Sequence, residues 1–276
     1  MKRIGTYQIS SLILSRFYLD GGAMFGAIPK NLWEKWFIPD EANRIELVAR
    51  SLLLCNGERK ILIDLGLGEK WSQKQREIFA IFNTPREDTQ INPLEITDII
   101  LTHLHFDHSG GVSNLNDHGM LELCYPKATI HVQRSNFEAA RNPNPREKAS
   151  YLKENVEILL KGELNLIEGS CEILPNIWVH ESNGHTRGLQ YIEVKDSDQN
   201  LLFLSDLVPT SHHLPKHYTM GYDMWAERVM EEKESLLSYA EQNKSLVVFE
   251  HDPVIEAARI GRNAKGNFAV IDSISI

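Results

Sequence analysis

The sequence THLHFDHSGG, residues 102–111, carries four side chains that can bind a metal: His103, His105, Asp107 and His108. It directly follows a short apolar run, which is typical of a buried strand. Residues two apart in an extended segment project to the same side, so His103 and His105 can reach one ion. A turn at the closing glycines then lets Asp107 and His108 face a second ion. Because three imidazoles and a carboxylate beside a buried strand cost free energy unless they are used, the segment predicts a metal site.

Three later apolar runs, which we expect to be strands, each lead into a further side chain of a ligand type: His185, Asp206 and His251. Active sites of α/β proteins gather in the loops at strand ends. The pattern therefore predicts that these loops complete a site for two divalent metal ions. Nitrogen and oxygen ligands without a thiolate favour zinc, while manganese, iron and cobalt also fit such a set.

The composition describes an acidic globular chain of 276 residues with a net charge of −9 and 42% hydrophobic residues. An acidic surface repels phosphate backbones, so no nucleic-acid partner is expected. No apolar stretch approaches the ~18 residues of a membrane span, so no membrane association is expected. The three cysteines, Cys55, Cys124 and Cys171, are too scattered for a disulfide framework and indicate reduced thiols in a cytoplasmic protein.

Strand and helix patterns alternate along the whole chain, and no linker divides it. We therefore expect an α/β layered sandwich that forms a single domain over residues 1–276. The Asn56-Gly57 pair predicts a hairpin, and Asp20-Gly21-Gly22 predicts a loop after the first long strand. Helices are predicted at residues 69–82, 135–141, 147–160 and 225–242. Strands are predicted at residues 7–17, 46–55, 60–64, 98–101, 129–132, 164–167, 177–180, 191–194, 201–204, 246–249, 257–262 and 268–271.

The motif at residues 103–108 resembles the H-x-H-x-D-H pattern of the metallo-β-lactamase superfamily, and the later ligand types recur in that family's order. The resemblance covers essentially the whole chain. It implies a four-layer αββα sandwich with the site at one edge between two β-sheets. It also implies a ligand assignment: His103, His105 and His185 for the first metal, Asp107, His108 and His251 for the second, and Asp206 as a bridge between both.

The chemistry implied by this site is hydrolysis of a small-molecule substrate. Two adjacent divalent cations lower the pKa of a shared water, so that a metal-bridging hydroxide exists near neutral pH and acts as the nucleophile. Asp107 would orient this hydroxide and pass its proton to the leaving group. Tyr222 would assist as an electrophile by hydrogen-bonding the substrate carbonyl. No serine or cysteine nucleophile is needed.

Residues 19–26 resemble a loop that covers the metal site in quorum-quenching N-acyl-homoserine lactonases and in the methyl parathion hydrolase group. In those enzymes the loop presents apolar side chains. Met24 and Phe25 are therefore candidates for substrate binding, with ordinary core packing as the alternative.

The segment that follows the bridging aspartate also looks like this lactonase group. There His213 could hydrogen-bond a substrate carbonyl, whereas His212 and His217 are expected in solvent-exposed loops. Two departures concern the lactone specificity. Leu189 stands where the family often has a second histidine, and Pro209 stands where some lactonases carry a tyrosine. These changes leave the metal ligands intact but weaken any assignment to a particular lactone.

Three classes of function remain open. The first is a dinuclear metal-dependent hydrolase that opens lactones or cleaves carboxylic esters, acyl-homoserine lactones included. The second is a phosphotriester or phosphodiester hydrolase, since the same hydroxide can attack phosphorus. The third is a non-catalytic metal-binding protein, and the complete set of seven ligand-type residues argues against it. The loop at residues 19–26 is compatible with a homodimer that completes the pocket.

Overall fold

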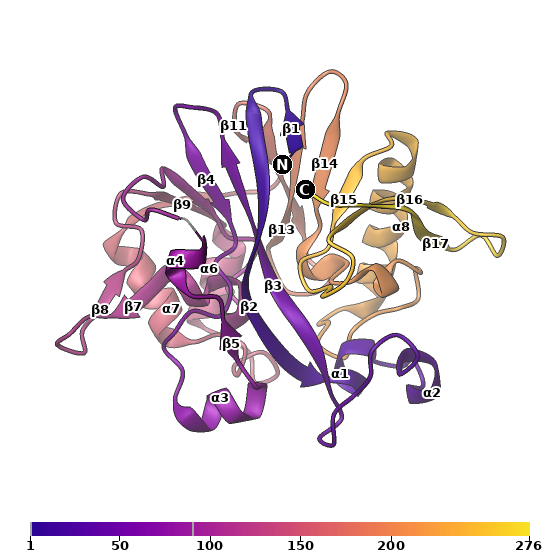
Figure 1. Ribbon diagram of the computed structural model, residues 1–276, viewed down its shortest axis with the longest axis horizontal. Helices are drawn as coiled ribbons and strands as arrows, with labels where there is room; N and C mark the ends of the chain where they lie inside the picture. The colour runs from indigo at the N-terminus through magenta and orange to yellow at the C-terminus, as the bar shows by residue number, and fades with distance from the viewer. Residues whose placement is uncertain (1, 90) are drawn as a thin grey trace. The chain divides into compact units, whose positions relative to one another are not determined.

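The computed structural model describes residues 2–89 and 91–276. The chain forms two compact units, coloured by residue number in Figure 1. Unit 1 contains the residues up to Arg16 together with Ala49–Gly169, and unit 2 contains Phe17–Val48 together with Ser170–Ile276. Each unit combines strands with helices, as predicted for an α/β chain. The single domain predicted over residues 1–276 stays a prediction.

Unit 1 is built on an eight-stranded sheet. Its strands are β1 Lys2–Ile4, β2 Tyr7–Asp20, β3 Arg44–Cys55, β4 Lys60–Ile63, β5 Phe82–Asn83, β6 Asp98–Ile100, β9 Thr129–Gln133 and β10 Glu163–Ile167. The residues of β2 from Phe17 onward and those of β3 up to Val48 are counted in unit 2. They follow the order β1-β2-β3-β4-β6-β9-β10, with β5 paired to β2. β3 and β4 pair antiparallel with Cys55 opposite Lys60, which confirms the hairpin predicted at Asn56-Gly57.

From β4 onward this sheet is parallel, as β4, β6, β9 and β10 pair in sequence order. Parallel strands are covered on both faces and therefore consist of nearly unbroken apolar runs. Leu62, Ile99 and Ile130 accordingly lie in one buried cluster, which Phe137 and Leu159 also join.

Short helices and a small sheet complete unit 1. The sheet pairs β7 Ser113–Leu115 with β8 Leu121–Leu123. The helices are α3 Gln73–Phe79, α4 Arg86–Thr89, α5 Phe106–Ser109, α6 Arg134–Arg141 and α7 Lys153–Glu157, with 3₁₀ turns at Gly110–Val112 and Ile158–Lys161.

Unit 2 is built on a seven-stranded sheet with the strands in sequence order. These are β11 Cys171–Leu174, β12 Ile177–Ser182, β13 Leu189–Lys195, β14 Asn200–Phe203, β15 Leu246–Val248, β16 Ala257–Arg262 and β17 Phe268–Ile274. The remaining elements are α1 Gly21–Phe25, α2 Lys30–Trp33 and α8 Ala226–Gln242, with 3₁₀ turns at Ser205–Leu207 and Ser211–His213. β14 and β15 are parallel, and the long helix α8 is the connection between them.

Helix α8 is amphipathic and packs its apolar side into the core of unit 2. Val229 and Leu237 on the helix lie in one buried cluster with Leu202, Val247 and Ala258 of the sheet. Their spacing along the helix follows its period of 3.6 residues, which explains why the helix could be predicted from the sequence alone.

Local hydrogen bonds explain where α3 and α1 differ from the prediction. The helix expected over residues 69–82 is only α3, because Ser72 caps its start and Ala80 adopts a left-handed φ of 43° at its end. The loop expected at Asp20 is instead the start of α1, since the Asp20 carboxylate accepts a hydrogen bond from the Ala23 N–H at 2.7 Å. A cap of this kind satisfies a backbone donor that a helix start leaves open.

The helix predicted over residues 147–160 is also interrupted. Its first part forms turns, in which the Ser150 N–H donates to the Glu147 carbonyl at 2.8 Å. Only α7 is α-helical, and a 3₁₀ turn follows it at Ile158–Lys161. The predicted helix is thus confirmed as α-helix only over α7.

The glycines of the motif at residues 102–111 also permit close backbone contact, a role that the sequence analysis did not predict. Gly110 has an ordinary helical φ of −58°. A Cβ at Gly110 would lie 2.0 Å from the Leu67 carbonyl oxygen, and a Cβ at Gly68 would lie 2.2 Å from the Gly110 oxygen. The loop after β4 therefore touches the motif backbone to backbone, which only glycine permits.

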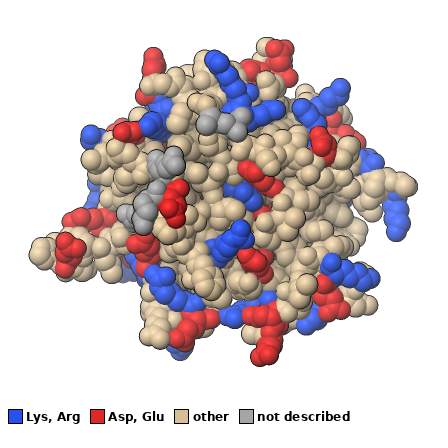
Figure 2. Space-filling view, in the orientation of Figure 1, with Lys and Arg blue, Asp and Glu red and all other residues tan. Residues whose placement is uncertain are grey.

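Two surface properties bear on the predicted partners. Within the residues that the structure describes, no helix is long and apolar enough to cross a membrane. Lys and Arg side chains are interspersed with Asp and Glu on the face drawn in Figure 2. On that face the charges of both signs are thus mixed and not gathered into one large patch.

We predict that Gly110→Ala destabilises the chain by about 3 kcal/mol or more, because the added methyl group overlaps a backbone oxygen that cannot move away. Gly57→Ala is the control, since Gly57 has a φ of 90° but nothing within 4 Å of an added Cβ. It should cost only the strain of the left-handed backbone, about 1–2 kcal/mol. Urea unfolding of both variants measures the difference, and equal losses would contradict the close-contact explanation.

Candidate metal centre

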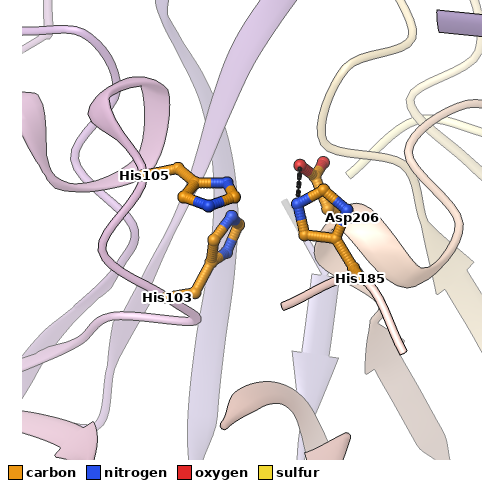
Figure 3. A group of neighbouring side chains, drawn as sticks. All are labelled: His103, His105, His185 and Asp206. Atoms are coloured by element: carbon orange, nitrogen blue, oxygen red, sulfur yellow. Dashed lines mark ion pairs between the residues drawn. The ribbon is translucent and has the colours of Figure 1, made fainter. Parts of the chain in front are cut away.

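The motif loop, residues 102–109, gathers its four predicted ligands within unit 1. His103, His105, Asp107 and His108 are all at least 94% buried. The ring centroid of His103 lies 4.4 Å from that of His105 and 4.0 Å from that of His108. Figure 3 shows His103 and His105 side by side at the start of this loop. The i, i+2 spacing therefore brings the two imidazoles together as predicted.

Backbone and side-chain contacts hold the motif loop in place. The Leu104 N–H donates to the buried Asn136 side-chain oxygen at 2.9 Å. The Ser109 hydroxyl donates to the carbonyls of Leu104 and His105 at 3.2 and 3.0 Å. Each bond satisfies a polar group that burial would otherwise leave costly, so the loop has little freedom to rearrange.

Asp64 is a supporting residue that the sequence analysis missed. It directly follows the strand β4, has a left-handed φ of 54° and is fully buried. Its carboxylate accepts hydrogen bonds from the Thr102 N–H at 2.7 Å and the Thr102 hydroxyl at 2.5 Å, and it lies 3.0 Å from His108 Nδ1. A carboxylate on Nδ1 fixes the ring and leaves Nε2 as the ligand atom. Only the position of Asp64 directly after a strand and two residues before Gly66 could have indicated this role.

The predicted ligands of unit 2 meet at Asp206. One of its carboxylate oxygens lies 3.1 Å from His185 Nε2, and the other lies 2.9 Å from His251 Nε2. The dashed line in Figure 3 marks the ion pair with His185. Asp206 sits in the 3₁₀ turn after β14, where Ser205 has a left-handed φ of 49°. This backbone is unfavourable for a serine and directs the carboxylate inward.

The outer ring nitrogens in unit 2 are already hydrogen-bonded. His251 Nδ1 lies 2.8 Å from the carbonyl oxygen of Val48, and His185 Nδ1 lies 2.9 Å from the Asp223 carboxylate. Because a carbonyl only accepts, the proton of a neutral His251 is on Nδ1, and the lone pair on Nε2 faces Asp206. Two lone pairs at 2.9 Å repel each other unless a second proton or a metal ion lies against both. The donor set therefore fits a divalent cation.

Asp223 is the second supporting residue that the sequence analysis missed. It is 5% exposed, and its other oxygen accepts a hydrogen bond from the Met220 N–H at 2.7 Å. This bond closes a tight turn and aims the remaining oxygen at His185. The neighbouring Tyr222 is exposed, and its predicted role as an electrophile stays a prediction.

Met24, Phe25 and His213, which were predicted to bind substrate, are buried in unit 2 with at most 2% exposure. The ring of Phe25 stacks on that of His213 at 4.7 Å. His213 Nε2 donates to the Met24 carbonyl at 2.9 Å, and Nδ1 accepts from the Thr210 hydroxyl at 2.7 Å. Both ring nitrogens are thus used within the protein. For Met24 and Phe25 this burial agrees with the alternative of core packing, and the substrate contact of all three residues stays a prediction.

Five further histidines lie outside these groups, and His118 among them is exposed. His217 is exposed as predicted, but His212 is half-buried and stacks on Trp36 at 4.8 Å, which corrects the expectation of an exposed loop residue. His131 pairs with Asp98 at 3.0 Å, and His180 pairs with Glu193 at 2.9 Å, far along the chain from the motif.

All seven predicted ligands belong to groups of buried His, Asp and Glu side chains whose ligand atoms could hold a metal ion. The family-model comparison agrees with this chemistry. The model of the metallo-β-lactamase superfamily matches residues 45–251. The chain therefore belongs to the metallo-β-lactamase superfamily, as the resemblance of its motif indicated.

Curated relatives cover most of the chain. An N-acyl homoserine lactonase from a Bacillus species is 27% identical over 225 residues, which are 75% of this chain and 82% of the relative. The N-acyl homoserine lactonase AiiA of Bacillus thuringiensis subsp. kurstaki is 26% identical over 217 residues, which are 72% of this chain and 79% of the relative.

Solved structures agree over nearly the full length. A probable metal-dependent hydrolase from Staphylococcus aureus has a TM-score of 0.87 at 27% identity. The match covers 99% of this chain and 100% of the chain of that hydrolase. AidC, a dizinc quorum-quenching lactonase in complex with a product, has a TM-score of 0.79 at 18% identity. The match covers 100% of this chain and 97% of the AidC chain. These likenesses confirm the predicted α/β metallo-β-lactamase fold and the prediction of a metal-dependent hydrolase of this superfamily.

We predict that Asp64→Asn lowers the affinity for Zn²⁺ by about 10–100-fold, because the amide cannot supply the charge that orients His108 and increases its basicity. Asp98→Asn is the matched control, since it removes a carboxylate from the buried pair with His131. Titration of the metal-free variants with Zn²⁺ measures both affinities. A loss of equal size in Asp98→Asn would refute a specific role for Asp64.

The buried position of His213 predicts an acid-sensitive contribution to stability. Burial lowers the pKa of His213 from 6.5 to about 3, so the folded state keeps the ring neutral while the unfolded state takes up a proton below pH 6.5. The stabilisation is complete above pH 6.5 and falls toward pH 3 by up to about 1.4 kcal/mol per pH unit.

The variant His213→Gln keeps an N–H that can donate to Met24 but does not titrate. The free energy of unfolding of the metal-free chain, measured with urea at pH 7, 6 and 5, should therefore decrease less steeply in this variant. Parallel pH dependences would show that His213 does not contribute in this way.

Proposed function

We propose that the chain is a dinuclear metal-dependent hydrolase that opens lactones or cleaves carboxylic esters, with acyl-homoserine lactones as the first substrates to test. The observation that carries the proposal is the complete set of seven ligands, in which each oxygen of Asp206 faces a different imidazole. The N-acyl homoserine lactonases at 26–27% identity support the choice of substrate class. In this proposal residues 1–276 act as one catalytic domain.

The proposed ligands follow the family pattern. His103, His105 and His185 bind one ion, Asp107, His108 and His251 bind the other, and Asp206 bridges them. Zinc suits these nitrogen and oxygen donors, and the dizinc lactonase AidC shares the fold. When bound, the two ions activate a water at neutral pH and polarise the scissile carbonyl group.

The chain's own residues would then position the substrate and move the proton. Asp107 is 6% exposed at the first turn of α5, and one of its oxygens lies 3.7 Å from His108 Nε2. From there its carboxylate can accept the proton of the attacking water and donate it to the leaving oxygen. Tyr222, which is exposed beside the buried Asp223, can hydrogen-bond the substrate carbonyl.

The decisive experiment combines a metal assay with a panel of substrates. The Zn²⁺-loaded chain should hydrolyse acyl-homoserine lactones or simple esters much faster than a phosphotriester or a β-lactam. Asp107→Asn should keep its fold but lose about 10²–10⁴-fold in kcat, because the proton-transferring carboxylate is gone. Elemental analysis should find two ions in the wild type and fewer in His103→Ala.

Each other outcome of this experiment has a clear meaning. Faster turnover of the phosphotriester would favour the phosphotriesterase alternative on the same ligands. Two bound ions without turnover of any substrate would favour a non-catalytic metal-binding protein. Two retained ions in His103→Ala would refute the ligand assignment.

A further inference from the structure

Two consecutive charged residues of α8, Glu232 and Lys233, bind two different segments of unit 2. Consecutive residues project about 100° apart around a helix, so they can reach different neighbours. The Glu232 carboxylate accepts hydrogen bonds from the Ser182 hydroxyl at 2.6 Å and from the Asn183 N–H at 3.0 Å. The Lys233 ammonium donates to the carbonyls of His213, Pro215 and Tyr218, the latter two at 3.1 and 2.7 Å.

The contact of Glu232 fixes the turn that carries His185. The start of α8 reinforces it, since the Trp225 N–H donates to the Gly184 carbonyl and the Met224 N–H donates to the His185 carbonyl, both at 2.9 Å. A Cβ at Gly184 would lie 2.7 Å from a side-chain carbon of Val229 and 2.9 Å from a carboxylate oxygen of Glu232. The backbone of His185 is thus attached closely to α8.

The contact of Lys233 fixes the segment that carries Asp223. Its three carbonyl partners lie between residues 213 and 218, and the segment continues directly into the turn in which Asp223 binds the Met220 N–H. Asp223 in turn holds Nδ1 of His185. Glu232 therefore acts on the backbone of His185, and Lys233 acts on the group that orients its ring.

The burial of Lys233 indicates that its hydrogen bonds, and not apolar packing alone, account for a lysine at this position. The side chain is fully buried, and burial lowers its pKa to about 7. A buried amine costs free energy that an apolar residue of the same length would not. Its three hydrogen bonds bind the end of the 3₁₀ turn Ser211–His213 and the irregular segment that follows it.

We propose that Glu232 and Lys233 are positioning residues, which set the orientation of His185 and thereby the metal affinity and ligand geometry of the site. This inference rests on the proposed function, because it takes His185 as a metal ligand. Glu232 and Lys233 act through other residues and touch neither metal nor substrate in this proposal.

The test uses the full-length, metal-free chain titrated with Zn²⁺ and with Co²⁺, whose visible absorption reports the ligand geometry. Lys233→Met, which keeps the length of the side chain but removes its donors, should weaken binding by about tenfold or more and change the Co²⁺ spectrum. Leu237→Ala is the matched control, since it removes a buried apolar side chain from the same helix but no hydrogen bond to either segment. It should lower stability while its metal affinity and spectrum stay those of the wild type.

A double-mutant cycle with Asp223→Asn separates positioning from general destabilisation. If Lys233 acts through Asp223, the double variant should lose less affinity than the product of the two single losses. Losses that simply multiply, or a wild-type affinity and spectrum in Lys233→Met, would overturn the proposal.

A folding failure of Lys233→Met would leave the decision to Glu232→Ala, whose side chain is partly exposed. This variant should show the same kind of spectral change, and an unchanged spectrum would overturn the proposal. A wild type that binds neither ion would overturn both this inference and the proposed function. A wild type that binds both ions but hydrolyses no substrate would overturn the proposed function alone.

Discussion

The candidate metal ligands of unit 2 are arranged around a single carboxylate that faces one imidazole with each of its oxygens. Asp206 reaches His185, which follows the strand β12, and His251, which follows β15. Because the outer nitrogens of both rings are already bonded, the inner nitrogens present electron pairs to an anion. An arrangement of this kind is stable only with positive charge at its centre, so the chemistry of a cation site is built into the resting protein.

A second layer of residues turns this cluster into a defined geometry. Asp64 holds His108, Asp223 holds His185, and a main-chain carbonyl holds His251. Each contact selects one tautomer of its ring and restricts its rotation. The supporting groups belong to segments distant in sequence, so the ligand geometry requires that each unit be folded first.

The candidate ligands could be proposed from the sequence, whereas the residues that support them could not. The spacing of His103, His105 and His108 is a rare local pattern with a direct geometric meaning. Asp64 and Asp223 are single aspartates after a strand or in a turn, and nothing local distinguishes them from solvated ones. Their roles come from contacts to His108 and His185 across 44 and 38 positions of sequence.

The fold shows the same division between local and non-local information. The long helix α8 and the hairpin of β3 and β4 were predicted because their periods and turn residues are local signals. The end of α3 at Ala80 could not be predicted, since it depends on a left-handed backbone. The apolar side chains of Met24 and Phe25 suit a pocket as well as a core, and only their surroundings decide between the two.

Tyr222 and Asp223 are adjacent in the chain but differ in their exposure to solvent. One side chain is open to solvent, while its neighbour is buried against the ring of His185. The peptide bond between them thus marks the boundary between the surface of unit 2 and the buried surroundings of His185.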